Sequence, residues 1–466
     1  MFDENEDDYY DGDLSEEMKR FEAFLEGESI GFLDSDRWEA LIDHLLMNGR
    51  YNDAILCADE ALSQFSYNLL FKLRKAQSFS ATGKLKEAIF LLSELERLGM
   101  DSFELLLSKG AVFSQLKDSK NAIKYFKNAL GAASVEDKDE VYLDLAMEYE
   151  NLGDYRAALK VLGEAVVHNP GNEAAIYEIA YCYDHLEDYE SSVKCYSDFI
   201  DENPYSFTSW YNLGNAYSKL ENYDKAIWAY DYCILINDDF GPVHFNMASA
   251  YLSINKYTKA IEYFLQSLEL DGDDPVTYCY VGECYEQLND LELAKKYYKH
   301  SLELAPLLPD AWLGLGIVED LQGRTKEAIP FISKALELDP DNAGIYHVLA
   351  GAYEKLDRIK DATENYELSL ALDPTDEDCL VNYVQLIAKK SSREALDYLV
   401  LFENTAPNNA IIDVLKINVL WDLGMKIDAL ELFKTCLLEN REKALELYEV
   451  NPNLKNVKDF LLLSDN

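Results

Sequence analysis

The chain has 466 residues, with 87 acidic and 42 basic side chains and a formal net charge of −45 at neutral pH. A surface this negative repels phosphates, so direct binding to nucleic acids or adsorption to anionic membranes is disfavoured. No segment approaches the roughly 18 consecutive apolar residues of a membrane-spanning helix, and Met1 and Phe2 are followed by acidic residues rather than by a secretory leader. We therefore expect a cytoplasmic protein with no membrane insertion.

The cysteines and histidines give no sign of a catalytic or metal centre. Eight cysteines are dispersed, none forms a C-x-x-C pair, and Cys279 and Cys284 have no histidine nearby at ligand spacing. They are interpreted as small core residues in a reducing compartment. The chain also has no nucleophile–base pair, no Gly-rich phosphate loop and no H-E-x-x-H motif. The sequence predicts no catalytic residue, no metal and no cofactor.

The first 17 residues are predicted to be an acidic, disordered tail. Residues 3–17 hold nine acidic side chains and no basic one, around Tyr9 and Tyr10, and such a composition is typical of disorder. The tail either solubilises the chain or is a short motif that docks into a basic groove, including one of the chain's own. Residues 18–34 follow with a partial amphipathic pattern that predicts a leading helix.

From residue 35 to residue 440 one pattern recurs with a period close to 34. Its markers are small residues: Ala54, Ala88, Ala122, Ala158, Ser192, Ala226, Ala260, Ala294, Ala328, Ala362, Ala395 and Ala429. A period of this length predicts an array of helical repeats. The spacing is irregular at 131–139 and at 389–393, where either a flexible point or a tolerated surface loop is expected.

Within one period, two amphipathic helices are predicted. In the stretch from residue 207 to residue 242 the first helix shows an apolar stripe at Trp210, Leu213, Gly214 and Tyr217. The second shows one at Ala226, Ile227, Tyr230, Cys233 and Ile234. Because Gly214 and Ala226 are small, they are expected to let the two helix backbones approach each other at their crossing.

These residues resemble the tetratricopeptide repeat, whose pattern is Trp-x2-Leu-Gly-x2-Tyr followed by alanine, an aromatic residue and proline. Two stretches match it directly: Trp210, Leu213, Gly214, Tyr217, Ala226 and Tyr230, and then Trp312, Leu315, Gly316, Ala328, Ala335 and Pro340. About twelve units cover residues 35–440. The resemblance implies an all-α, right-handed superhelical solenoid of stacked antiparallel helix pairs, of the kind found in bacterial scaffold proteins.

In that family the first helix of each pair lines the concave face. The resemblance therefore implies a set of partner-binding residues: Tyr177, Glu178, Tyr181, Asp184, Tyr211, Asn212, Asn215, Phe245, Asn246, Tyr280, Glu283 and Glu286. Asparagine can pair with the backbone of an extended peptide, aromatic rings stack on Arg or Lys, and carboxylates pair with cations. The alternative for each residue is a solvated helix face without a ligand.

The asparagines also bear on the kind of ligand. Asn215 and Asn246 match the two asparagines with which chaperone-binding members of the family hold a peptide. Those members add basic residues that clamp a terminal carboxylate, and here Tyr211, Val276 and Tyr280 stand at the basic places. The resemblance therefore implies that acidic C-terminal tails are poor ligands.

Residues 441–466 are predicted to form C-terminal capping helices. Terminal repeats must cover an exposed apolar face, and the segment from Leu454 to Leu463 has the composition for that role. The run from Phe460 to Leu463 is more apolar than a cap requires, so a homodimer contact through this helix is the alternative.

The leading hypothesis is a non-enzymatic interaction scaffold or adaptor. It binds a Lys/Arg-rich or apolar segment of another protein in an acidic, aromatic concave groove, with an on-rate that falls as salt rises. The second hypothesis is a structural subunit that self-associates, or joins a larger assembly, through convex or terminal surfaces.

Overall fold

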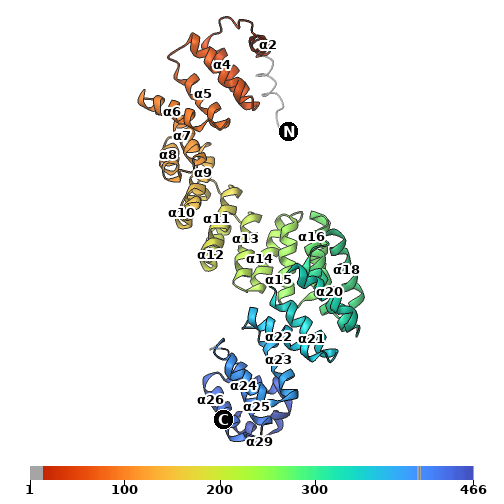
Figure 1. Cartoon of the computed structure of the whole chain (residues 1–466). Coiled ribbons are helices and arrows are strands. Elements are labelled where there is room, and N and C mark those ends of the chain that lie inside the picture. The colour runs from red at the N-terminus through yellow and green to blue at the C-terminus, as the bar shows by residue number, and fades with distance from the viewer. Residues whose placement is uncertain (1–13, 407–408, 410, 465–466) are drawn as a thin grey trace. The chain divides into compact units, whose positions relative to one another are not determined.

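A computed structural model describes residues 14–406, 409 and 411–464, and every regular element among them is a helix (Figure 1). The chain is therefore all-α, as expected. Its internal contacts divide it into two compact units, residues 1–237 and residues 238–466, and each unit is described by itself.

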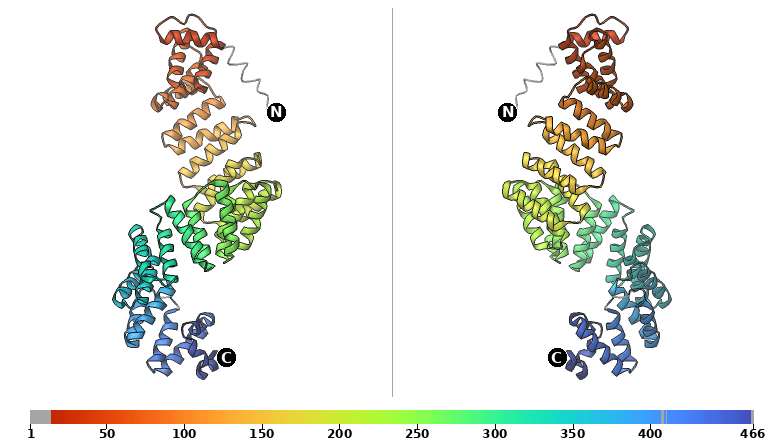
Figure 2. Two further views of the ribbon diagram at one scale, coloured as in Figure 1. Left: turned by 90° about the vertical axis from the view of Figure 1, so that its right-hand side faces the viewer. Right: turned by 90° about the vertical axis from the view of Figure 1, so that its left-hand side faces the viewer.

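The first unit consists of antiparallel helix pairs stacked along the chain, which Figure 2 shows most plainly for residues 69–168. Its helices are α2 (Ser15–Leu25), α3 (Ser35–Met47), α4 (Tyr51–Gln64), α5 (Leu69–Ala81), α6 (Leu85–Arg97), α7 (Phe103–Gln115), α8 (Ser119–Ala132), α9 (Lys138–Asn151), α10 (Tyr155–His168), α11 (Glu173–Leu186), α12 (Tyr189–Glu202), α13 (Phe207–Lys219) and α14 (Tyr223–Ile236).

The leading helix begins earlier and is shorter than the span expected at 18–34. It is α2, and irregular chain follows it because Gly27 and Gly31 adopt positive φ angles of 101° and 71°. The Arg20 guanidinium donates to the carbonyl oxygens of Ile30 and Phe32, each at 3.1 Å, and so ties this irregular segment back to α2. Of the expected acidic tail, residues 1–13 lie outside the described residues.

The second unit continues the same plan of helix pairs. Its elements are α15 (Gly241–Ser253), α16 (Tyr257–Asp271), α17 (Pro275–Gln287), α18 (Leu291–Leu304), α19 (Pro309–Leu321), α20 (Thr325–Leu338), α21 (Ala343–Lys355), α22 (Ile359–Leu372), α23 (Glu377–Lys390), α24 (Ser392–Phe402), α25 (Ile411–Asp422), α26 (Lys426–Glu439), α27 (Arg441–Leu445), α28 (Leu447–Val450), η1 (Pro452–Asn456) and α29 (Lys458–Ser464).

The C-terminal helix α29 packs one side chain of its apolar run into the core. The Phe460 ring is fully buried and lies 5.0 Å, centroid to centroid, from the rings of Trp421 and Phe433. Leu461 and Leu462 remain exposed. Through these contacts α29 packs against α25 and α26.

The marker residues of the repeat are the tightest points of the packing. All eleven marker alanines have no exposed surface, and Ser192 is also buried. Each lies in the first turn of the second helix of its pair, where only a small side chain fits between crossing backbones.

Gly214 has a different role from the one expected. A Cβ at Gly214 would overlap the ring of Tyr230, which lies sixteen residues further along on the second helix. The same spacing recurs for Gly110 with Phe126 and for Gly282 with Tyr298. The glycine therefore makes room for an aromatic ring of the second helix, rather than for its backbone.

Candidate partner-binding surfaces

Within each unit several first helices of successive pairs contact one another: α9 with α11 and α11 with α13 in the first unit, and α17 with α19, α19 with α21 and α23 with α25 in the second. Their second helices come close to one another far less. The side chains that the first helices present to solvent therefore form one surface per unit, and we call these the first-helix faces.

On the first-helix face of the first unit, tyrosines and acidic residues alternate. Tyr177, Tyr181 and Asp184 are exposed, and Glu178 is partly exposed. The pKa of the Tyr177 hydroxyl on α11 is raised by partial burial and then by the nearby Tyr211 hydroxyl on α13. The face thus presents aromatic area next to carboxylates.

Three aromatic rings meet at one end of this surface. The His185 ring stacks on Tyr155 at 4.6 Å with an interplanar angle of 3°, and it meets Tyr181 edge-on at 4.4 Å. The sequence did not single out Tyr155, which reaches this cluster from the second helix α10. Such a rigid cluster offers contact area at low entropic cost.

The asparagines of the first unit do not behave as expected. Asn212 is only 3% exposed, so its amide is not on the solvent-facing surface, and its Nδ2 atom has no hydrogen-bond partner among the described residues. Asn215 is partly exposed, but its Oδ1 atom already accepts a hydrogen bond from the Tyr230 hydroxyl at 2.8 Å. Asn212 was expected among the partner-binding residues, but its buried side chain does not belong to the solvent-facing surface.

On the first-helix face of the second unit, the sequence-predicted residues come together. The Phe245 ring on α15 lies 5.9 Å from the Tyr280 ring on α17, and the Phe264 ring on α16 stacks on Tyr280 at 5.5 Å. Asn246 is partly exposed beside Phe245. Glu283 and Glu286 follow Tyr280 on α17 by one turn and almost two turns.

A third carboxylate, which the sequence analysis did not select, joins this group. Asp310, in the first turn of α19, is close enough to raise the pKa of both Tyr280 and Glu283, although burial is the larger cause for each. The repeat register alone could not predict that Asp310 lies near Glu283, because this depends on the contact between α17 and α19. We call Phe245, Tyr280, Glu283, Glu286 and Asp310 the acidic aromatic patch.

No basic side chain of the described residues is paired with the carboxyl groups of the acidic aromatic patch. Burial and the nearby Glu283 carboxylate raise the pKa of Glu286 to about 7, despite a hydrogen bond that it accepts from the Tyr298 hydroxyl at 2.9 Å. Among the described residues, no lysine or arginine forms an ion pair with Glu283, Glu286 or Asp310. An added positive charge here would be stabilised by all three.

Other acids nearby in the second unit are already paired. Glu319 binds both Lys295 and Arg324. Asp320 binds Lys355 at 2.6 Å, and Glu354 binds Lys389 at 2.7 Å. These carboxylates of α19 and α21 therefore differ from those of the acidic aromatic patch.

The thiols are poor nucleophiles. Cys57, Cys182, Cys233, Cys279, Cys284 and Cys379 are buried, as the sequence predicted. Burial raises the pKa of the Cys284 thiol to about 12 and that of the Cys379 thiol to about 11. A thiol needs a lowered pKa to act as a nucleophile at neutral pH.

Comparison with known proteins identifies the family. Residues 103–135, 241–274, 282–343 and 321–380 match models of the tetratricopeptide repeat. Residues 151–233 match the model of the anaphase-promoting complex, cyclosome, subunit 3. This chain is a tetratricopeptide-repeat protein, and its fold supports the general role of a protein–protein interaction scaffold.

Several solved structures resemble the chain. The APC/C hetero-tetramer Cut9–Hcn1 shares 16% identity over 83% of this chain and 97% of that chain, with a TM-score of 0.43. YrrB, described as a tetratricopeptide-repeat protein with an unusual peptide-binding site, shares 19% over 42% and 97%, with a TM-score of 0.33. A tetratricopeptide-repeat protein from Parabacteroides merdae ATCC 43184 shares 14% over 52% and 95%, with a TM-score of 0.43.

No curated protein matches this chain. Within the described residues, no helix combines the length and the apolar composition that crossing a membrane requires.

Proposed function

We propose that this protein binds a Lys/Arg-containing segment of a partner protein on its first-helix faces, with apolar side chains of that segment lying against the exposed aromatic rings. The observation that carries the proposal is the acidic aromatic patch. Three carboxyl groups lie there beside two rings, without a basic side chain of the described residues paired to them.

The physical reason is the cost of leaving these acids unpaired. Raised pKa values show that Glu283 and Glu286 are harder to ionise than free carboxyl groups. A lysine or arginine of the partner restores the ionised form and gains charge-assisted hydrogen bonds. The Phe245 and Tyr280 rings then contact the aliphatic stem or the cationic head of the same side chain.

The first-helix face of the first unit supports a second contact of the same chemistry. Tyr177, Tyr181 and Tyr211 supply aromatic area, and Glu178 and Asp184 supply charge. Asn212 has no part in it, because its side chain is buried.

The test compares two variants that lose the same charge in the same unit. The patch variant is Glu283→Gln, Glu286→Gln and Asp310→Asn. The control is Asp239→Asn, Glu262→Gln and Glu269→Gln, all at exposed positions outside the patch. Binding is measured to an array of synthetic peptides, one set rich in Lys and Arg with interspersed Leu, the other rich in Asp and Glu with the same Leu residues.

We expect the wild type and the control variant to bind the cationic set alike, and the patch variant to bind it at least about 10-fold more weakly, because it loses paired charges at a partly buried site. Added salt should weaken wild-type binding. Equal loss in both variants would show that the total charge of −45 attracts the peptides, and the proposal would then be wrong.

A second candidate function is a subunit of a larger assembly, and one comparison favours it. Residues 151–233 match a family model named for a subunit of a multiprotein complex. The second helix α14 also exposes large apolar side chains, namely Trp228, Tyr232 and Leu235. A stable complex in analytical ultracentrifugation that the patch variant leaves intact, but that Trp228→Ala disrupts, would favour this candidate. A homodimer through α29 predicts instead that Leu462→Glu converts a dimer to a monomer.

A further inference from the structure

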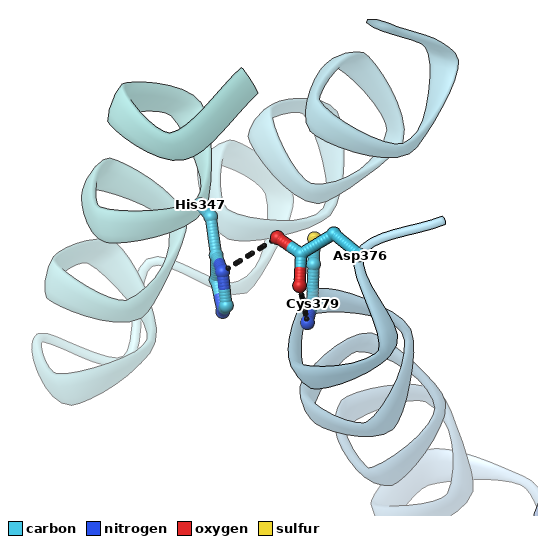
Figure 3. A group of neighbouring side chains, drawn as sticks. All are labelled: His347, Asp376 and Cys379. Atoms are coloured by element: carbon cyan, nitrogen blue, oxygen red, sulfur yellow. Dashed lines mark hydrogen bonds and ion pairs between the residues drawn. The ribbon is translucent and has the colours of Figure 1, made fainter. Parts of the chain in front are cut away.

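Three potential metal ligands from two successive repeats converge in the second unit (Figure 3). His347 lies on α21, Asp376 is the N-cap residue of α23, and Cys379 is in the first turn of α23. One ligand atom from each, a ring nitrogen, a carboxylate oxygen and the thiol sulfur, lie within 4.8 Å of one another. They come together although 29 residues or more separate His347 from the other two.

Hydrogen bonds orient the carboxylate and the imidazole. Asp376 Oδ1 accepts from the Cys379 backbone N–H at 2.9 Å, which fixes the carboxylate at the end of α23. Asp376 Oδ2 lies 3.1 Å from His347 Nδ1. The second oxygen therefore points at the imidazole, and Figure 3 shows the thiol sulfur behind the same carboxylate.

We propose that His347, Asp376 and Cys379 bind one Zn²⁺ ion through Nδ1, Oδ2 and Sγ. Zinc accepts this mixture of nitrogen, oxygen and sulfur ligands, with bond lengths of about 2.0–2.3 Å that place two tetrahedral ligands roughly 3.5 Å apart. The His347–Asp376 pair already has nearly that separation, and the widest pair needs to close by roughly 1 Å. A water molecule takes the fourth position, since the side chains of His347 and Asp376 are 21% and 23% exposed.

Asn382 completes the outer shell. Its Nδ2 atom lies 3.0 Å from His347 Nε2, the ring nitrogen that does not contact Asp376. When Nδ1 binds the ion, Nε2 carries the proton, and a rotation of the Asn382 amide presents its carbonyl oxygen to accept it. Such a partner on the far nitrogen is usual for a metal-bound histidine.

The surroundings favour a cation and give the ion a structural role. Asp373 adds a further negative charge close to Cys379. The ion would join α21 to α23, a junction where the first helices make fewer close contacts than α19 with α21 or α23 with α25. A zinc ion would therefore hold two successive repeats together.

The test uses Co²⁺ in place of Zn²⁺ on the full chain under reducing conditions. Cobalt bound by a thiolate in a tetrahedral site gives a sulfur-to-metal charge-transfer band and strong visible absorption, whereas cobalt held by surface carboxylates gives neither. This distinction is needed because a chain with a net charge of −45 binds divalent ions loosely at many places. We expect one cobalt ion per chain with these bands, displaced by an equivalent of Zn²⁺.

Four variants assign the signal. Cys379→Ser should abolish the charge-transfer band, while Cys284→Ser, which alters another buried cysteine, should leave it unchanged. His347→Gln, at a partly exposed position, should lower cobalt affinity at least 10-fold. Asn382→Ala should lower it by about 10- to 100-fold. Absence of the band in the wild type, or its persistence in Cys379→Ser with native circular dichroism, would overturn the proposal.

Discussion

At the scale of single residues, Glu286 shows how the repeat creates an unusual carboxyl group. The Tyr298 hydroxyl, twelve residues further along, donates to it, and Tyr366 donates to Glu354 with the same spacing at 3.1 Å. Lys389 neutralises Glu354, but no basic side chain of the described residues neutralises Glu286. Burial therefore dominates, and the pKa of Glu286 rises to about 7.

This raised pKa predicts a stability that falls as pH rises. The folded state binds the Glu286 proton more tightly than the unfolded state, whose pKa is near 4.5. Stability from this group is thus complete below about pH 4.5 and lost as pH passes 7. We expect Glu286→Gln, which keeps an acceptor for Tyr298, to match the wild type at pH 5 and to exceed it at pH 8 by on the order of 1–2 kcal/mol. Urea unfolding of both proteins at the two pH values measures this, and a constant difference would contradict it.

At the scale of helices, an aromatic ring joins two successive pairs. The Tyr298 ring on α18 lies between Gly282 on α17 and Gly314 on α19, and a Cβ at Gly282 would come within 2.8 Å of it. With glycine on both sides the ring can pack flat against two backbones. The first helices are thereby brought close enough for Asp310 to act on Glu283.

This packing predicts opposite effects for two glycine substitutions in the second unit. Gly314→Ala should lower the free energy of unfolding by about 1–3 kcal/mol. The Tyr298 ring already packs against Gly282 on its other side, so it cannot move away from the new methyl group. Gly351→Ala, where the nearest atom to a new Cβ is 4.0 Å away, should instead stabilise by up to about 1 kcal/mol through helix propensity. Thermal unfolding followed by circular dichroism compares them. A shift in the same direction for both would show that ring packing does not decide the outcome.

At the scale of the molecule, the core is divided into local clusters. One cluster holds Phe21 and Trp38 and extends only to Phe71, and a separate one begins at Leu73. Each helix pair is buried chiefly by its neighbours, so stability is expected to be a sum of local terms. Damage at one end should not spread to the other unit.

Substitution at α2 tests this locality. Phe21→Ala removes a fully buried ring and should cost about 3–5 kcal/mol. Hydrogen exchange followed by mass spectrometry should rise over residues 15–64 and stay at its wild-type level over residues 238–466. Phe32→Ala, at an exposed ring, is the control and should change neither region. Faster exchange throughout the chain would mean that the repeats unfold as one cooperative body.

The helix pairs could be predicted because the sequence pattern that specifies them is local. The period of the marker alanines and the apolar stripe of each helix depend on residues a few positions apart, and all eleven alanines are buried as that pattern requires. The turns within the helix pairs share a backbone conformation that the residue types at these positions do not reveal. Residues Lys117, Glu187, Glu221, Asn255, Asn289 and Asp357 adopt positive φ at the place where other repeats have glycine, because the fixed crossing of the helices imposes it.

Which side chains lie on the first-helix faces could be determined only from the tertiary structure. The sequence located Phe245, Tyr280, Glu283 and Glu286, but it also selected Asn212, whose side chain is buried. Contacts between repeats, such as Asp310 with Glu283 or His347 with Asp376, join residues about 30 positions apart. The repeat period determined that such residues would be neighbours, whereas only the packing of one helix pair on the next decided which side chains meet and which acids are left without a cation.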